Sequence, residues 1–412
     1  MPILDSDNLG GVNDVVELTI GGAGTTRVCE SYEVKQSIFT QPNGYAIRLG
    51  SAETAKKLLS YATPNTPTEL RINGLLQQTG WIDGPELSSG GGGTIVTIHG
   101  RDATAVIHDP YFTADKNYGS SLSIGELTGE VLDLVVPRSY TLVYSNAANR
   151  QAQTGGTPKL TAPDDLKAAL TAPKNKQRSA KFGHKVWEFL KHEHEQAGLF
   201  LWATADGNFI LSQPHAAQKP LYRIVRQYGL TRNVVSVENI TWKNVATGRF
   251  SSYEVRARGG GKAAVAVSAP QAPPDVQPAL VGSGGTTGRK QHVGVYTDAE
   301  MVAWGIDRPW THVHAKATSP AMCEFLARRE CAKRRAENWS LSYLVPGHST
   351  VSLDGGSRIV WAVDTMVEVV DEILDIKGTF YIESLTFKRG PDGTATELTL
   401  LRPEDLIFGD PG

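Results

Sequence analysis

The sequence predicts a mainly β protein with an α+β middle: two related small β-barrel domains, the second one split by an insertion, plus an α+β domain. Two observations predict this class. The first is that short segments of alternating apolar residues, bounded by Gly, Pro and Asn, fill both ends of the chain. The second is that residues near 90 and near 390 resemble each other. The 412 residues allow two to four domains of ordinary size.

Residues 1–108 are the first predicted β-barrel domain. Alternation of apolar and polar residues is typical of strands with one buried face, and Asn73-Gly74 is typical of a two-residue hairpin turn. Six short strands in about 90 residues indicate a small barrel or sandwich. The expected strands are Val15–Ile20, Arg27–Ile38, Tyr45–Leu49, Thr68–Ile72, Leu76–Ile82 and Thr94–His99.

Residues 109–231 are the predicted α+β domain. Ser123 and Glu126 have the spacing of a capping box, and apolar residues follow them at helical period. A second helix is expected from about Gly183, followed by a hairpin that turns at Asp206-Gly207. A polar insertion, residues 146–178, is rich in Gln, Gly, Pro and Lys and is expected to be mainly loop.

The second β-barrel domain is expected to be discontinuous, with residues 232–258 and 339–403 on either side of an insertion. The insertion, residues 259–338, begins with a Gly-, Pro- and Ala-rich arm. Because this arm lacks apolar residues that could fill a core, it is predicted to be exposed or poorly ordered. The insertion ends in a basic helix over residues 320–338, and residues 404–412 form a C-terminal tail.

An internal repeat connects the two β domains. Trp81-Ile82-Asp83 precedes a Gly-rich turn at residues 90–93 and a returning strand that ends in Arg101-Asp102. Tyr381-Ile382-Glu383 likewise precedes a turn at residues 390–393 and a strand that ends in Arg402-Pro403-Glu404. Two related domains would explain this similarity. The alternative is chance likeness between two unrelated hairpins.

Composition narrows the class of protein. Lys and Arg total 41 and Asp and Glu total 43, so the net charge of −2 argues against a protein that binds nucleic acid through a strongly basic surface. The three cysteines, Cys29, Cys323 and Cys331, are too few for a disulfide framework and fit synthesis in a reducing compartment. No stretch approaches the ~18 apolar residues of a membrane span. We therefore expect no membrane insertion.

No motif in the chain indicates an enzyme. His192 and His194 would lie about 160° apart around a helix, so we expect surface positions rather than zinc binding for these residues and His184. The nucleophile motif G-x-S-x-G is missing from the sequence. Asp83 and Glu86 have the residue types of a glycosidase pair, but the sequence does not define their separation. We expect no catalytic residue, no metal ligand and no cofactor.

Several segments, taken in order, resemble a family of tail proteins. They are Gly80 to Asp83, Ile95 to Asp102, and the helix and hairpin from Val186 to Phe209. Together with the order of elements from about Val15 to Pro403, they are similar to the late control protein D family, the baseplate hub proteins of Mu-like contractile-tail phages.

The resemblance implies a homotrimer in which two barrels per chain form a pseudo-sixfold ring. Such a hub joins the hexameric tail tube, or a tube-initiator protein, to the trimeric central spike and contacts other baseplate proteins. It lines a channel through which DNA leaves without specific binding. The expected location is the tail baseplate of the virion, after synthesis in the host cytoplasm.

Two charged sets are candidates for an interface or the channel. A basic set on the expected helix could bind an anionic partner, although a solvated or salt-bridged face is the commoner role of such residues. An acidic set could repel DNA phosphates from the channel wall. The basic set is Arg328, Arg329, Lys333, Arg334 and Arg335, and the acidic set is Asp364, Glu368, Asp371, Glu372 and Asp375.

Two alternative functions remain open from the sequence. The first is a tail-associated peptidoglycan hydrolase that uses the barrels as a scaffold, which predicts cell-wall degradation by the purified chain. The second is the related hub of a contractile bacteriocin or of a type VI secretion spike.

Overall fold

The computed structural model describes residues 14–21, 24–26, 30–49, 59–90, 93–143, 178–227, 240–257, 292–314, 317, 319–353, 358–390 and 393–407. The polar insertion up to residue 177, the Gly-, Pro- and Ala-rich arm and Cys29 lie outside these residues. The chain divides into two compact units. Unit 1 is Met1–Thr241 with Leu341–Pro403, and unit 2 is Trp242–Ser340 with Glu404–Gly412.

Seven strands form the first repeat of unit 1, and their alternating burial confirms the predicted β pattern. They lie in the order β3-β4-β7-β6-β5-β1-β2 with antiparallel neighbours. The predicted turn at Asn73-Gly74 joins β5 and β6, with positive φ at both residues. The bounds are β1 (Val16–Ile20), β2 (Gly24–Thr26), β3 (Ser31–Ser37), β4 (Gly44–Leu49), β5 (Pro67–Ile72), β6 (Leu75–Gly90) and β7 (Gly93–Asp102).

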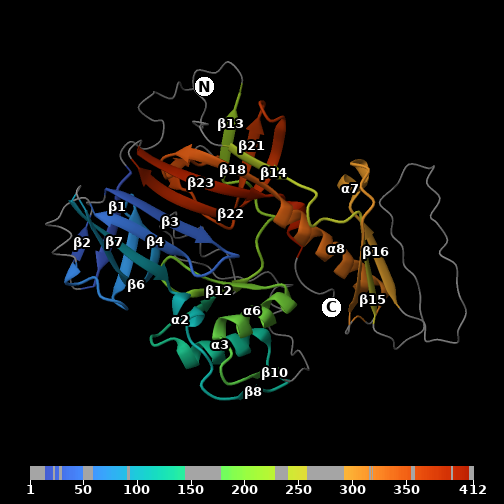
Figure 1. The fold of residues 1–412 in the computed structure, drawn as a ribbon, viewed down its shortest axis with the longest axis horizontal. Coiled ribbons are helices and arrows are strands. Elements are labelled where there is room, and N and C mark those ends of the chain that lie inside the picture. Colours follow the sequence, from blue (N-terminus) through green and yellow to red (C-terminus); the bar gives the residue numbers. More distant parts are fainter. Residues whose placement is uncertain are drawn as a thin grey trace, which may run out of the picture. The chain divides into compact units, whose positions relative to one another are not determined.

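The second repeat continues the same sheet in the order β14-β18-β23-β22, with β21 paired to β22 and β13 paired in parallel to β21. Because β22 also pairs with β3, the strands of both repeats form one 13-stranded sheet (Figure 1). The sequence predicted two related β-barrel domains, and their strands share this one sheet. The sequence placed β13 in the α+β domain, and the structure places it in the sheet instead. The bounds are β13 (Tyr222–Arg226), β14 (Ile240–Asn244), β18 (Trp339–Pro346), β21 (Thr365–Asp371), β22 (Ile376–Gly390) and β23 (Gly393–Leu401), with a separate pair β19 (Ser349–Val351) and β20 (Arg358–Val360).

The α+β part of unit 1 packs its helices around one apolar core. The predicted capping box is confirmed, because the Ser123 hydroxyl accepts from Glu126 N and the Glu126 carboxylate accepts from Ser123 N. The predicted hairpin is confirmed as β11 and β12. The elements are α2 (Ala105–His108), β8 (Lys116–Tyr118), α3 (Ile124–Val135), β9 (Leu142–Val143), β10 (Arg178–Ala180), α6 (Val186–Ala197), β11 (Phe200–Ala203) and β12 (Phe209–Ser212).

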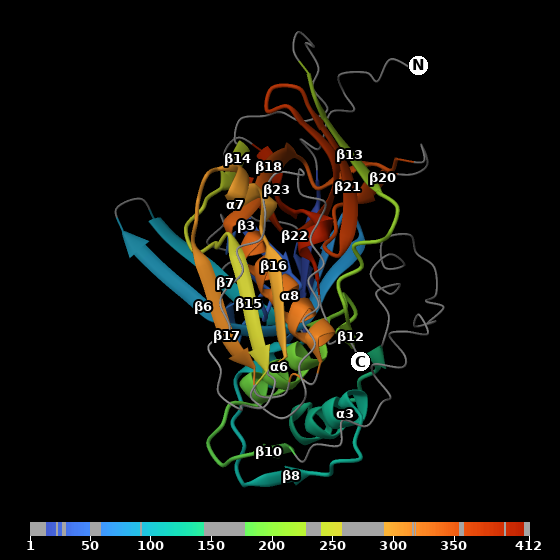
Figure 2. The ribbon, with the colours of Figure 1, turned by 90° about the vertical axis from the view of Figure 1, so that its right-hand side faces the viewer.

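Unit 2 is a three-stranded sheet, β16-β15-β17, with helix α8 packed on one face (Figure 2). Alternate residues of β15, among them Tyr253 and Val255, are buried under α8 together with Cys323 and Cys331, which are free cysteines. The sequence placed residues 252–258 in the second barrel. The structure corrects this, because β15 pairs with β16 and β17. The elements are β15 (Ser252–Ala257), β16 (Val293–Thr297), α7 (Ala299–Ala303), β17 (Pro309–His314), α8 (Pro320–Asn338) and the short helix η2 (Pro403–Asp405), which begins at the end of unit 1.

The helix predicted over residues 320–338 is confirmed as α8, with Ser319 as its N-cap. Among the described residues, no helix combines the length and the apolar content that crossing a membrane requires.

Candidate interaction surfaces

The hairpins β6–β7 and β22–β23 have the same construction. The first half of each long strand pairs with one neighbour, β5 or β21, and the second half pairs with the returning strand of the hairpin. The register shifts between Ile82 and Gly84 in one hairpin and between Ile382 and Ser384 in the other, so the same position carries a bulge. Residues whose numbers differ by 300 therefore occupy equivalent places, and the two hairpins are a structural repeat.

The two repeats meet where β3 pairs with the second half of β22, from Ser37 opposite Ser384 to Tyr32 opposite Arg389. Val34 lies opposite Phe387 at the middle of this contact, and neither side chain is accessible to solvent. Backbone hydrogen bonds and buried apolar side chains thus hold the first repeat directly on the second.

A buried polar cluster holds the same junction. The Tyr32 hydroxyl lies 2.7 Å from His348 Nε2, and Thr396 Oγ1 lies 3.0 Å from His348 Nδ1. Asp14 Oδ2 accepts hydrogen bonds from His348 N at 2.7 Å and from Thr394 Oγ1 at 3.1 Å. Burial lowers the pKa of His348 to about 4, so the imidazole is neutral near pH 7. No local pattern in the sequence marks His348, because its partners are more than 40 residues away along the chain.

The carboxylates of Asp83 and Glu86 face basic partners on the same hairpin. Arg101 Nη2 lies 2.7 Å from Asp83 Oδ1 and 2.6 Å from Asp109 Oδ2. His99 Nε2 lies 3.3 Å from Glu86 Oε2. Through these contacts both carboxylates connect β6 to β7. The contacts do not support a catalytic role for Asp83 and Glu86 as a glycosidase pair.

Two of the basic residues on α8 are engaged within unit 2. Arg334 Nε lies 2.7 Å from Glu330 Oε1, and its guanidinium lies 4.9 Å from the centre of the Phe250 ring. Arg335 Nε lies 3.2 Å from the buried carboxylate of Asp405. Both side chains therefore stabilise α8 in its place, as the structural interpretation of this helix predicted.

The other basic residues of α8 are more accessible. Arg328 and Lys333 are exposed, and Arg329 is half-buried. Lys333 Nζ lies 4.0 Å from Glu337 Oε1, one helical turn away, which is a weak contact. Arg328 and Lys333 are the members of the basic set that remain available to an anionic partner.

The acidic set is also divided by the structure. The carboxylates of Asp364 and Asp371 are buried. Asp364 Oδ1 accepts from the Tyr381 hydroxyl at 2.8 Å. Asp371 Oδ2 accepts from the Tyr343 hydroxyl at 2.8 Å and lies 3.3 Å from Arg226 Nη1. Because these two carboxylates are engaged inside the fold, they cannot present charge to a channel, which corrects the prediction for both residues.

The remaining acidic residues lie on β21 and the turn after it. Glu368 is half-buried, and its Oε2 lies 3.3 Å from Arg223 Nε. Glu372 and Asp375 are exposed, and Asp375 has a φ of 52° in the turn between β21 and β22. A negative channel wall formed by this segment would therefore depend on Glu368, Glu372 and Asp375.

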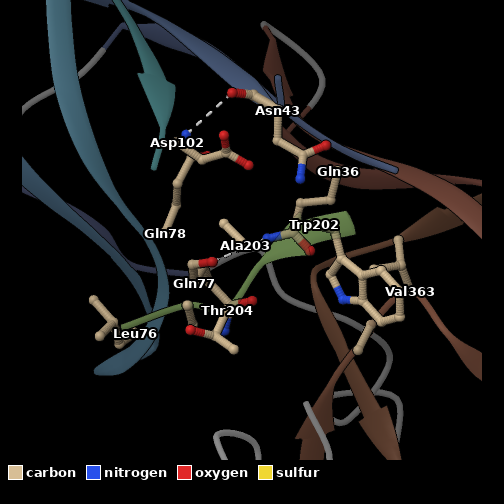
Figure 3. A pocket seen from close by; sticks show the side chains of 12 residues that line it. Gln36, Asn43, Leu76, Gln77, Gln78, Asp102, Trp202, Ala203, Thr204 and Val363 are labelled. Carbon is tan, nitrogen blue, oxygen red and sulfur yellow. Dashed lines mark hydrogen bonds between the residues drawn. The ribbon is translucent and has the colours of Figure 1, made fainter. Parts of the chain in front are cut away.

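A small polar pocket lies in unit 1 (Figure 3). Amide side chains, including Gln36 and Gln78, line it beside Trp202, with a cavity volume of about 50 Å³. Thr104 N donates to Asp102 Oδ1 at 2.9 Å, and burial raises the pKa of Asp102 to about 6. The pocket has room for a few water molecules but not for an organic ligand, which needs about 300 Å³ or more.

The three histidines near α6 do not converge. The ring of His194 is buried, with Nε2 2.8 Å from Thr128 Oγ1 of α3, and burial lowers its pKa to about 3. The expected surface position is therefore wrong for His194, whereas His184 and His192 are exposed. No group of three His, Cys, Asp or Glu side chains in the described ranges could hold a metal ion.

The chain has the fold of phage tail proteins, and the predicted mainly β class with an α+β part is confirmed. It is similar to a tail protein from Neisseria meningitidis MC58, with a TM-score of 0.67, 18% identity, and coverage of 95% of this chain and 99% of that chain. It is also similar to the 43 kDa tail protein of prophage MuSo2 from Shewanella oneidensis, with a TM-score of 0.65, 16% identity and coverage of 96% and 100%.

A more distant match is the prophage tail protein gp18 from Listeria monocytogenes EGD-e, with a TM-score of 0.50, 8% identity and coverage of 94% of both chains. No protein-family model matches the chain. No curated protein matches it either.

Proposed function

We propose that this protein is a structural baseplate hub of a contractile phage tail, and that three copies form a ring of six repeats with pseudo-sixfold symmetry. The observation that carries the proposal is the pair of equivalent hairpins, 300 residues apart, joined in one sheet through β3 and β22. A chain that already places two equivalent β units side by side supplies one third of such a ring. The shared fold of tail proteins over nearly the whole chain supports the same role.

In this proposal the ring adapts one symmetry to another. Its six repeats would match a hexameric tail tube or a tube-initiator protein, and its threefold axis would match a trimeric central spike. Other baseplate proteins would bind its outer surface, and the protein would reside in the baseplate of the virion. A hub of the same construction would also suit a contractile bacteriocin or a type VI secretion spike. Capsid genes next to the gene for this protein would identify the particle as a phage.

The assembly is tested by light scattering on the purified chain. One chain has a mass of 44.5 kDa, so a trimer has a mass of about 134 kDa. We expect this mass for the protein alone. If the trimer forms only with its spike partner, we expect this mass after the mass of the spike protein is subtracted from that of the complex. A monomer at every concentration, with and without the spike protein, would overturn the proposal.

The channel is tested separately. We expect Glu368→Lys, Glu372→Lys and Asp375→Lys together to slow DNA ejection and reduce plaque formation, because a basic wall retains phosphates. Exposed Glu188, Glu195 and Glu86 provide the control, since their replacement by Lys makes the same change of charge at positions away from β21 and its turn. Equal ejection by both variants would remove these three residues from the channel wall.

A further inference from the structure

We propose that β14 of one copy pairs with the second half of β6 in the next copy, so that the contact between copies repeats the contact that β3 and β22 make within the chain. This inference rests on the ring assembly proposed above and identifies the two strand edges that build it.

The first observation concerns the two long strands. The second half of β22 has β23 on one side and β3 on the other. The equivalent half of β6, from Gly84 to Ser88, has β7 on one side, and no strand of the described residues lies on its other side. The second repeat therefore has a partner strand at this edge, and the first repeat has none among the residues that the structure describes.

The second observation identifies the missing partner. In the first repeat, the strand that lies next to β4 is β3, and it is β3 that reaches across to β22. The strand in the equivalent place of the second repeat is β14, next to β18. Across the ranges that the structure describes, β14 has no second strand beside it. Within the chain, β3 of the first repeat pairs with β22 of the second. If the same contact is made between copies, β14 of the second repeat pairs with β6 of the first repeat in the next copy.

The exposure of apolar side chains agrees with this pairing. Leu87 is the equivalent of the buried Phe387, yet Leu87 is 58% exposed. Trp242, at the middle of β14, is 52% exposed, whereas Val34 at the middle of β3 is inaccessible. Trp242 and Leu87 are thus the exposed counterparts of Val34 and Phe387, which form a buried pair within the chain. Covering both would remove large apolar surfaces from water, which favours association.

Pro85 sets the extent of the pairing. Proline has no N–H, so residue 85 can only accept a hydrogen bond, and the ladder would be centred on Leu87. Proline on an edge strand also discourages unspecific pairing before assembly. The contact joins two different edges, so it is head-to-tail and can be repeated around a closed ring.

Crosslinking of the full chain tests the inference. Leu87→Cys combined with Trp242→Cys, treated with a short bismaleimide, should give covalent dimers and trimers, because opposite residues on paired strands have Cβ atoms about 5 Å apart. The control pairs Leu87→Cys with Val302→Cys, since Val302 is 53% exposed on α7 and not on a strand edge. We expect at least tenfold more crosslinked chain from the first pair.

Light scattering separates this inference from the hub itself. A trimer with crosslinking no greater than the control would overturn the β6–β14 contact and leave the hub in place, whereas a strict monomer would overturn both. As a second variant, Leu87→Glu should raise the concentration needed for assembly at least tenfold without changing the circular dichroism spectrum. Val302→Glu should assemble like the unmodified chain, and equal assembly of the two variants would also contradict the inference.

Discussion

Removal of the buried cation Arg249 should destabilise unit 2. Its guanidinium is inaccessible, and Nη2 lies 2.8 Å from Asp298 Oδ2 and 2.7 Å from Glu300 Oε2. Nη1 donates to Asn244 Oδ1 at 3.1 Å. Burial alone would lower the pKa of Arg249, but hydrogen bonds and charge from Asp298 and Glu300 raise it. The cluster joins β14, the segment before β15 and the start of α7, so its loss affects the whole unit.

The Arg249→Met variant keeps a long side chain and removes the charge. It leaves the Asp298 carboxylate, which is 1% exposed, without its cation. Breaking a buried pair in this way costs about 3–5 kcal/mol, which is roughly a 100-fold or larger change in the opening equilibrium. Hydrogen exchange at the amides of β15 and β16 should therefore accelerate roughly 100-fold or more, while the amides of β22 in unit 1 keep their rates.

The control for this prediction is Arg256→Met on β15. Arg256 is paired with Glu254, but its side chain is 50% exposed, so its loss should cost about 1 kcal/mol or less. If the Arg249 and Arg256 variants exchange at similar rates, the buried cluster does not stabilise unit 2, and the reasoning from burial is refuted. Replacing Asp298 by Asn together with Arg249→Met should recover part of the loss, because the unpaired charge is then removed.

Two further predictions concern packing and pH. Gly294→Ala would place a Cβ atom 2.0 Å from Glu324 N in the backbone of α8, so we expect the free energy of unfolding of unit 2 to fall by about 1–3 kcal/mol or more. The control is Gly129→Ala on α3, whose Cβ meets nothing within 4 Å and which should be neutral or stabilising. Equal urea stability of the two variants would contradict this packing. The lowered pKa of His194 contributes stability that is complete above pH 6.5 and is lost as the pH falls, by about 2 kcal/mol at pH 5. His194→Gln should remove this contribution in urea unfolding measured from pH 6.5 to pH 5. His348, whose lowered pKa acts in the same direction, and Asp102, whose raised pKa acts in the opposite direction, are common to both proteins. An unchanged slope would show that the His194 ring is not held neutral.

Local pattern was sufficient to predict many single elements. Apolar spacing predicted a helix over residues 320–338, which are the bounds of α8, and the Ser123–Glu126 spacing predicted the start of α3. These features depend on residues within one or two turns of each other, so they are readable from the sequence alone. The repeat was also visible, because its glycine turns and the strands around them have kept the same spacing.

Partners distant in the sequence could not be predicted in this way. Alternation shows that residues 252–257 form a strand with one buried face, but it does not say which strands lie beside it. The same limit hid the pairing of β3 with β22 and the burial of Asp371, whose partners Arg226 and Tyr343 lie on other strands. His194 is different, because it lies four residues after the apolar Leu190 on the same helix face. This spacing was a local signal of burial, and the predicted surface position overlooked it.

The place where the chain leaves the second repeat has a consequence for how the protein can vary. In the first repeat, β3 and β4 are joined by only the six residues from Ile38 to Asn43. In the second repeat, the equivalent strands β14 and β18 are joined by almost the whole of unit 2. Since the ends of a hairpin turn are already close together, a long segment can be added or removed there without a change in sheet register. The length and sequence of unit 2 can therefore change without altering the strand pairing of the sheet.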